Sequence, residues 1–201
     1  MPKRVDHSLR RLQIAEALWR IAASRGLEEV SMRQVAAEAG VSTRLVQYYF
    51  ETRDRLLVEA LALRNEYDRK RIESRLPEGA SLKEAIRVLL LGLLPLDDES
   101  RQSTLIHLAY GIRAVNDRLL AEHVTNHAKP GLEDIVADML RGAQAGAQLR
   151  DGLDLDREAA TLLALSSGMT YDVLMGIRTA DDAIALVDYN LRRVWRSESA
   201  T

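Results

Sequence analysis

Apolar residues recur three and four positions apart along most of the chain, which is the spacing of one buried face of an α-helix. The first stripe runs from Leu9 to Ala22 and stops before Gly26, and Ser8 is placed to cap it. Alternating apolar and polar runs, which would predict β-strands, are missing from the sequence. The pattern therefore predicts an all-α protein.

Two short helices are predicted on either side of Gly40. Ser31 can cap the first, over residues 32–39, and Ser42 can cap the second, over residues 43–50. Gly40 is suited to the left-handed conformation that ends a helix. Two helices joined by so tight a turn form a helix-turn-helix, whose second member can enter the major groove of DNA.

The second of these helices has one apolar and one polar face. Val46 and Phe50 lie one turn apart and are expected to face inward. Arginine and glutamine make bidentate contacts to base edges, threonine meets a thymine methyl group or a phosphate, and tyrosine hydroxyls reach phosphates. The outward positions carry these residue types: Thr43, Arg44, Gln47 and Tyr48.

A long helix is predicted from Thr52 toward Arg75, and its far end, Asp68 to Glu73, has the composition of a solvated charge run. We expect this helix to connect a domain over 1–52, the helix-turn-helix, to a helical domain over 53–201. Further helices are expected over 82–93, 98–114, 116–140 with a break or kink at Pro130, 156–177 and 179–194.

The final helix carries an apolar row, and its spacing is that of a helix–helix seam. Ile184, Val187, Leu191 and Val194 are three, four and three positions apart. Such a row either packs on its own chain or pairs with a second copy.

Composition and charge refine this picture. Hydrophobic residues make up 47% of the 201 positions, enough to bury a core. No run of about 18 apolar residues and no leader is present, and cysteine is absent, so a soluble protein of the reducing cytoplasm is expected. Residues 1–56 hold ten Lys or Arg against seven Asp or Glu, and the remainder eighteen against twenty-three. The positive excess thus lies in the part expected to meet phosphate.

One stretch resembles the signature of TetR-type one-component repressors of bacteria. The matching residues are Ala36, Ala39-Gly40-Val41-Ser42, Tyr49-Phe50, Thr52-Arg53-Asp54 and Leu56-Leu57. The string from Leu45 to Phe50 looks most like the branch that includes choline-responsive repressors. Arg44, Gln47 and Arg53 depart from the residues that the family often has there, which implies a different operator sequence rather than a different role.

The resemblance implies a homodimer that joins through its last two helices, binds a palindromic operator in double-stranded DNA and is released by a small-molecule effector. Residues 1–7, with Lys3 and Arg4, form either a basic arm that meets DNA or a frayed terminus. With the family positions included, the expected DNA-contacting residues are Arg33, Ser42, Thr43, Arg44, Gln47, Tyr48, Tyr49, Thr52 and Arg53.

A ligand pocket between helices of the larger domain is expected, lined by apolar side chains and a few polar groups. The candidates are His107, Tyr110, Arg113, Tyr171 and Met175, and each has an alternative role in packing or on the surface. Aromatic residues suit a quaternary ammonium, whereas Arg113 would favour an anion.

Neither a cofactor nor catalytic activity is expected. His123 and His127 have the spacing of two metal-binding imidazoles, but surface or pocket-lining roles are favoured over a metal site. The alternatives to a DNA-binding regulator are a helical ligand-binding module that lacks specific DNA binding and an all-helical enzyme.

Overall fold

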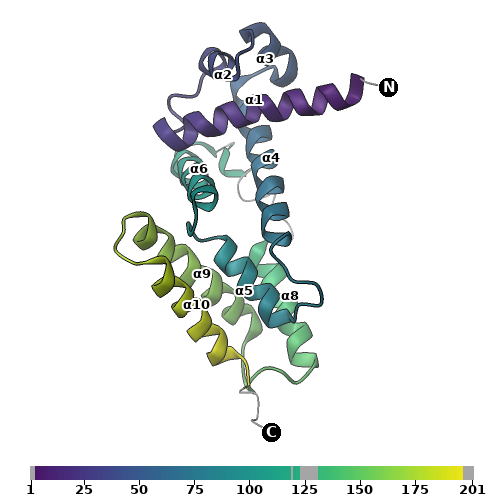
Figure 1. Cartoon of the computed structure of the whole chain (residues 1–201), viewed down its shortest axis with the longest axis vertical. Coiled ribbons are helices and arrows are strands. Elements are labelled where there is room, and N and C mark those ends of the chain that lie inside the picture. The colour runs from purple at the N-terminus through teal and green to yellow at the C-terminus, as the bar shows by residue number, and fades with distance from the viewer. Residues whose placement is uncertain (1–2, 119, 123–130, 197–201) are drawn as a thin grey trace. The chain divides into compact units, whose positions relative to one another are not determined.

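The computed structural model describes residues 3–118, 120–122 and 131–196 (Figure 1). It confirms the all-α fold class. Its helices are α1 (Lys3–Arg25), α2 (Met32–Ala39), α3 (Thr43–Phe50), α4 (Arg53–Glu73), α5 (Leu82–Gly92), α6 (Asp98–Val115), α8 (Leu132–Ala145), α9 (Leu155–Leu174) and α10 (Ala180–Val194).

Most helix limits follow the local signals in the sequence. Ser31, Ser42 and Thr179 each accept a hydrogen bond from a main-chain N–H at the start of the helix they cap. The start of α1 differs from the prediction, because the helix begins at Lys3 and Ser8 lies inside it. Residues 3–7 are therefore helical, not a frayed arm.

The chain forms two compact units. The head unit comprises Met1–Arg69 and Leu105–His127, and the body unit comprises Lys70–Thr104 and Ala128–Thr201. Helices α4 and α6 each pass from one unit into the other. The functional boundary at residues 52 and 53 stays a prediction, because compactness alone does not define which residues bind DNA or ligand.

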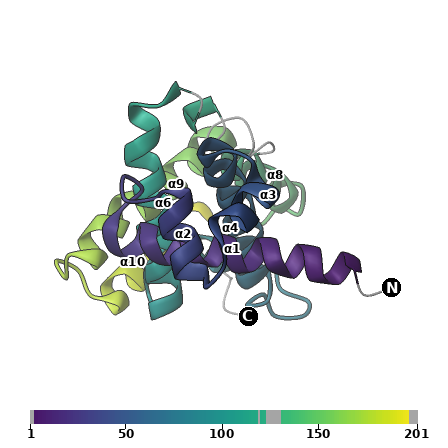
Figure 2. The ribbon, with the colours of Figure 1, turned by 90° about the horizontal axis from the view of Figure 1, so that it is seen from above.

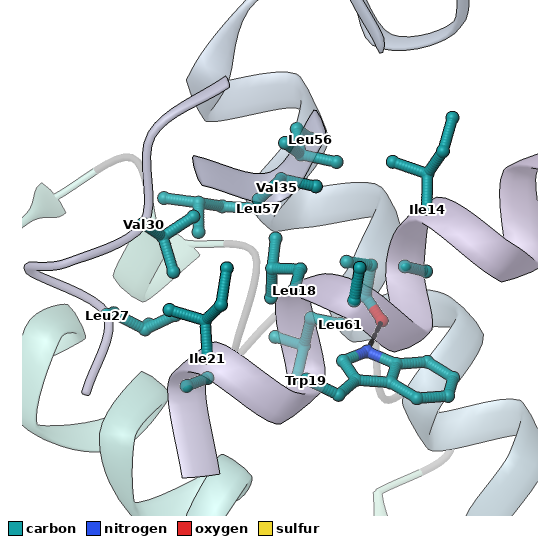
Figure 3. Packing of buried hydrophobic residues seen from close by; sticks show 14 of the residues in the cluster. Ile14, Leu18, Trp19, Ile21, Leu27, Val30, Val35, Leu56, Leu57 and Leu61 are labelled. Atoms are coloured by element: carbon teal, nitrogen blue, oxygen red, sulfur yellow. Dashed lines mark hydrogen bonds between the residues drawn. The ribbon is translucent and has the colours of Figure 1, made fainter. Parts of the chain in front are cut away.

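The core of the head unit is built around the buried face of α1 (Figure 3). Leu18 of α1 is fully buried, as are Val35 of α2 and Leu56 of α4. Trp19 donates its indole N–H to the main-chain carbonyl of Ala60 over 3.0 Å, which fixes α1 to α4. Burying these side chains supplies most of the stability of the unit, at about 25 cal/mol per Å² of apolar surface.

The body unit packs α5, α8, α9 and α10 around a second core. Arg87 of α5 and Asp188 of α10 form an ion pair across this unit, with Nε and Oδ1 2.5 Å apart. Gly92 lets the end of α4 approach α5 closely, because a Cβ atom at this position would lie 2.6 Å from Cγ1 of Ile72. None of the helices described combines the length with the hydropathy that a membrane span requires.

One expectation from the sequence is wrong in this part of the chain. Asp68 and Arg71 belong to the predicted solvated charge run, yet each is only 8% exposed. For the apolar row of α10, the structure shows the first of the two alternatives, since Val187, Leu191 and Val194 are buried in the body core of the same chain. Spacing identified this packing face but not what covers it.

Candidate nucleic-acid interface

The turn between α2 and α3 has the geometry expected from its glycine. Gly40 adopts φ 67° and ψ 32°, the left-handed conformation that glycine tolerates without strain. The next N–H, of Val41, donates to the carbonyl of Ala36 over 2.9 Å and closes the end of α2. The hydroxyl oxygen of Ser42 then accepts the N–H of Leu45 over 3.2 Å, which starts α3 only two residues after the turn.

Helix α3 presents a polar face to solvent. Val46 and Phe50 are fully buried, so the helix can sit in only one rotation about its axis. The opposite side of the helix is exposed and carries Arg44, together with Gln47 and Tyr48 three and four positions after it. Thr43 is half-buried. A short helix with a fixed rotation and free guanidinium and amide groups is suited to reading base edges in the major groove.

Side chains of α1 close the carboxyl ends of both short helices. Gln13 donates to the carbonyl of Ala39, the last residue of α2, over 3.0 Å. Arg11 donates to the carbonyl of Tyr49 near the end of α3 over 3.3 Å. The last carbonyls of a helix have no partner within it, so these donors satisfy groups that would otherwise need water. As a result α1 fixes the position of α3 through its backbone.

The start of α4 is held by Arg53 and Thr52. Arg53 donates from Nε to the carbonyl of Val30 over 2.6 Å and from Nη2 to that of Leu27 over 3.0 Å. The hydroxyl oxygen of Thr52 accepts the N–H of Arg55. Arg53 therefore braces the loop that precedes α2, a structural role that the sequence did not indicate.

The other predicted contact residues lie at the surface to different degrees. Arg33 and Ser42 are exposed. Tyr48 is 70% exposed, whereas Tyr49 is half-buried against the core of the head unit. Of the two tyrosines, Tyr48 is thus the more accessible to a phosphate.

The sequence matches two family models that together cover most of the chain. Residues 14–60 match the model of the bacterial regulatory proteins of the tetR family, and residues 82–196 match the C-terminal model of BetI-type transcriptional repressors. This chain belongs to the TetR family. The resemblance seen in the sequence is confirmed, including its branch.

Individual relatives agree with this assignment. The TetR-family chain is 31% identical over 188 residues to the HTH-type transcriptional regulator PksA of Bacillus subtilis, covering 93% of this chain and 90% of PksA. A putative TetR-family regulator from a Rhodococcus species has 27% identity and a TM-score of 0.81, over 91% of this chain and 97% of the other. A putative transcriptional regulator from Saccharomonospora viridis, crystallised in complex with choline, has 26% identity and a TM-score of 0.82, over 94% and 99%.

The five ligand candidates do not form one site within either unit. His107, Tyr110 and Arg113 belong to the head unit, and Tyr171 and Met175 to the body unit. Tyr110 is buried and donates its hydroxyl to the carbonyl of Leu57 over 2.8 Å. Burial raises the pKa of this phenol well above its usual range, so that it remains a donor at all physiological pH values.

The remaining candidates also have other contacts or are open to solvent. Nε2 of His107 lies 3.1 Å from Oδ2 of Asp68. Arg113 pairs with Glu28 at 2.9 Å and with Asp117 at 3.3 Å. Tyr171 and Met175 are each 61% exposed. Their assignment to a ligand site stays a prediction.

His123 and His127 lie outside the described residues. Within the part of the chain that the structure describes, no group of three or more His, Cys, Asp or Glu side chains is placed to hold a metal ion.

A buried ion pair on α4 was not predicted from the sequence. Arg64 is 3% exposed and donates from Nε and Nη2 to both carboxylate oxygens of Asp68, over 2.9 and 2.7 Å. Its guanidinium also lies 5.2 Å from the ring centroid of Trp19 and 5.0 Å from that of Tyr67. The spacing of four residues between Arg64 and Asp68 was the available signal.

The bracing role of Arg53 predicts a loss of stability on substitution. Arg53→Ala should lower the free energy of unfolding by about 2 kcal/mol, because two main-chain carbonyls lose charged donors. Denaturant unfolding followed by circular dichroism measures this change. Arg55→Ala is the matched control, since Arg55 forms only ion pairs with Glu51 and Glu59 at the surface and should change stability by less than about 1 kcal/mol. Equal effects of the two substitutions would contradict the bracing role.

Proposed function

We propose that this TetR-family DNA-binding regulator is a homodimeric repressor, which binds a palindromic operator through α3 and is released by a small-molecule effector in the cytoplasm. The observation that carries the proposal is the exposed face of α3, with Arg44, Gln47 and Tyr48 on a helix whose rotation is fixed by its buried residues. The alternatives, a ligand-binding module without specific DNA binding and an enzyme, leave this face without a use.

The expected contacts divide into two kinds. Arg44 and Gln47 are assigned to base edges, and Thr43 to a base methyl group or a phosphate. Arg33, Ser42, Tyr48, Tyr49 and Thr52 are assigned to the DNA backbone. Arg53 is assigned mainly to positioning, because its Nε and Nη2 donate to carbonyls of the head unit.

Dimerisation follows from the shortness of α3. Eight residues reach only a few base pairs, so a two-fold pair of reading helices is needed to define an operator. We assign this pairing to the side of α9 that its own core leaves open. Five exposed residues on α9 and at its C-cap are spaced three, four, three and four apart, which is the spacing of a helix–helix seam: Thr161, Ala164, Gly168, Tyr171 and Met175.

Helices α4 and α6 are suited to transmit release, because both continue from the head unit into the body unit. Within the head unit, the hydroxyl of Tyr110 in α6 donates a hydrogen bond to α4. Arg113 of α6 forms an ion pair with Glu28, which lies in the segment before α2. An effector that favours another arrangement of these helices would change the separation of the two reading helices. Such a population shift requires the effector to bind one arrangement more tightly than the other.

We propose an organic cation of the choline class as the effector. The Saccharomonospora viridis relative was solved with choline, and the C-terminal region of this chain matches the BetI-type model. The argument for an anion is weaker than the sequence suggested, because the charge of Arg113 is balanced by Glu28 and Asp117.

Sequence discrimination should depend on Arg44 and Gln47. With an operator selected from random duplexes by the wild-type protein, Arg44→Ala or Gln47→Ala should cost about 1–3 kcal/mol of binding free energy and relax the choice of base at one position in each half-site. Arg33→Ala should instead weaken binding to all sequences and reduce its salt dependence. Competition titrations with base-substituted operators measure both effects. Unchanged affinity and base preference for Arg44→Ala and Gln47→Ala would refute the assignment of α3.

The dimer surface is tested at Gly168. Apart from the backbone of its own helix turn and its chain neighbours, no heavy atom lies within 4 Å of a Cβ at this position. Gly168→Arg therefore fits within its own chain, but it would place a charged side chain in the proposed seam. We expect the variant to be monomeric by analytical ultracentrifugation and to lose operator binding. The control Gln144→Arg, at an exposed position on α8, should remain dimeric. A dimeric Gly168→Arg variant would exclude this face of α9.

The effector class is tested with choline and its uncharged analogue 3,3-dimethylbutanol. Choline should raise the melting temperature and release the protein from its operator, because aromatic faces attract a quaternary ammonium. The analogue has the same shape without the charge and should do neither. If choline at millimolar concentration produces no heat of binding and no release, the effector belongs to another class.

A further inference from the structure

Three aromatic rings from two helices meet beside the reading helix. We call His7 of α1 with Tyr48 and Tyr49 of α3 the aromatic cluster. The His7 ring centroid lies 4.5 Å from that of Tyr49 and 6.1 Å from that of Tyr48, and the two tyrosine rings are 5.2 Å apart. All three pairs meet edge to face, the arrangement that aromatic quadrupoles favour.

The segment of α1 that carries His7 lies outside the core of the head unit. Among the side chains of α1 that the structure describes, from His7 onward, the buried ones begin at Ile14, and His7, Ser8 and Leu9 are exposed. In Figure 2, the amino end of α1 extends past α3. Packing against the core therefore does not account for the position of His7, whose ring contacts the two tyrosines instead.

The surroundings of His7 are suited to an anion. Tyr48 shares the exposed face of α3 with Arg44, so the cluster lies at the edge of the surface that reads DNA. On α1, Arg10 and Arg11 are one turn further along and lie on the same side as His7. Arg10 donates to Oε1 of Gln13 and adds positive charge beside His7, whereas the charge of Arg11 is balanced by an ion pair with Glu59 of α4. From α3, the titratable groups that face the imidazole are the phenols of Tyr48 and Tyr49.

We propose that His7 is a DNA-contacting residue, which donates a ring N–H to a backbone phosphate at the edge of the operator half-site. The edge-to-face packing orients the imidazole. An imidazolium donates from both nitrogens and adds a charge, so the contact strengthens when the ring is protonated. Operator affinity then increases as the pH falls through the range in which histidine side chains titrate.

This inference rests on the proposed function and extends it by a residue outside the helix-turn-helix. Two substitutions separate a phosphate contact from simple packing. His7→Phe keeps an aromatic ring against the tyrosines but removes the N–H donors. His7→Gln keeps an N–H donor but cannot gain a proton.

The experiment measures binding of the full-length variants to the operator selected by the wild-type protein, at about pH 6 and about pH 8 and over a range of salt concentrations. At the lower pH, His7→Phe should bind about five- to tenfold more weakly than wild type, and its log–log salt slope should fall by about 0.9 per subunit. His7→Gln should bind like wild type at the higher pH but gain less affinity at the lower pH.

Glu16→Gln is the matched control, because Glu16 is exposed on the same helix but nine positions further along. It should retain the pH dependence and salt slope of the wild-type protein. If His7→Phe and His7→Gln both retain wild-type affinity, pH dependence and salt slope on an operator that wild type binds selectively, the role of His7 is refuted and the proposed function stands. If wild type selects no sequence at all, both fail.

Discussion

Two main-chain carbonyls of α4 determine how the reading helix is held. The indole of Trp19 donates to Ala60 from α1, and the phenol of Tyr110 donates to Leu57 from α6. Both donors are buried, where an unpaired polar group is costly, so neither contact can be lost without a replacement. Helices α1, α4 and α6 are thereby joined within the head unit, and α1 in turn closes the ends of α2 and α3.

This arrangement connects the structure to its regulatory role. In the proposed mechanism, the reading helix stays rigid while its separation from that of a second copy changes. The contacts of Gln13 and Arg11 with α2 and α3 provide the rigidity. The passage of α4 and α6 between the two units provides a route for the change, since a helix that is common to both units is displaced in both. The same helices can therefore carry information from an effector without distorting α3.

The sequence predicted the local structure well because the signals are local. Ser31, Gly40 and Ser42 determine the turn of the helix-turn-helix within twelve residues, and the family signature depends on the same positions. Contacts between distant segments left no such signal. The spacing of residues 184–194 showed an apolar row but not that the row covers its own core, and Arg53 carried no sign of the carbonyls 23 and 26 positions earlier. The packing of His7 on Tyr48 and Tyr49 joins residues about forty positions apart, so it could not be predicted from the sequence either.

The most direct test of the account is selection of bound duplexes from a random pool by the purified protein, followed by sequencing. A homodimer that reads DNA through α3 should enrich a two-fold symmetric motif, with half-sites about one helical turn, or a multiple of it, apart. An enriched but asymmetric motif would contradict the dimeric arrangement of reading helices. Failure to enrich any sequence would contradict the central claim that the exposed face of α3 reads an operator.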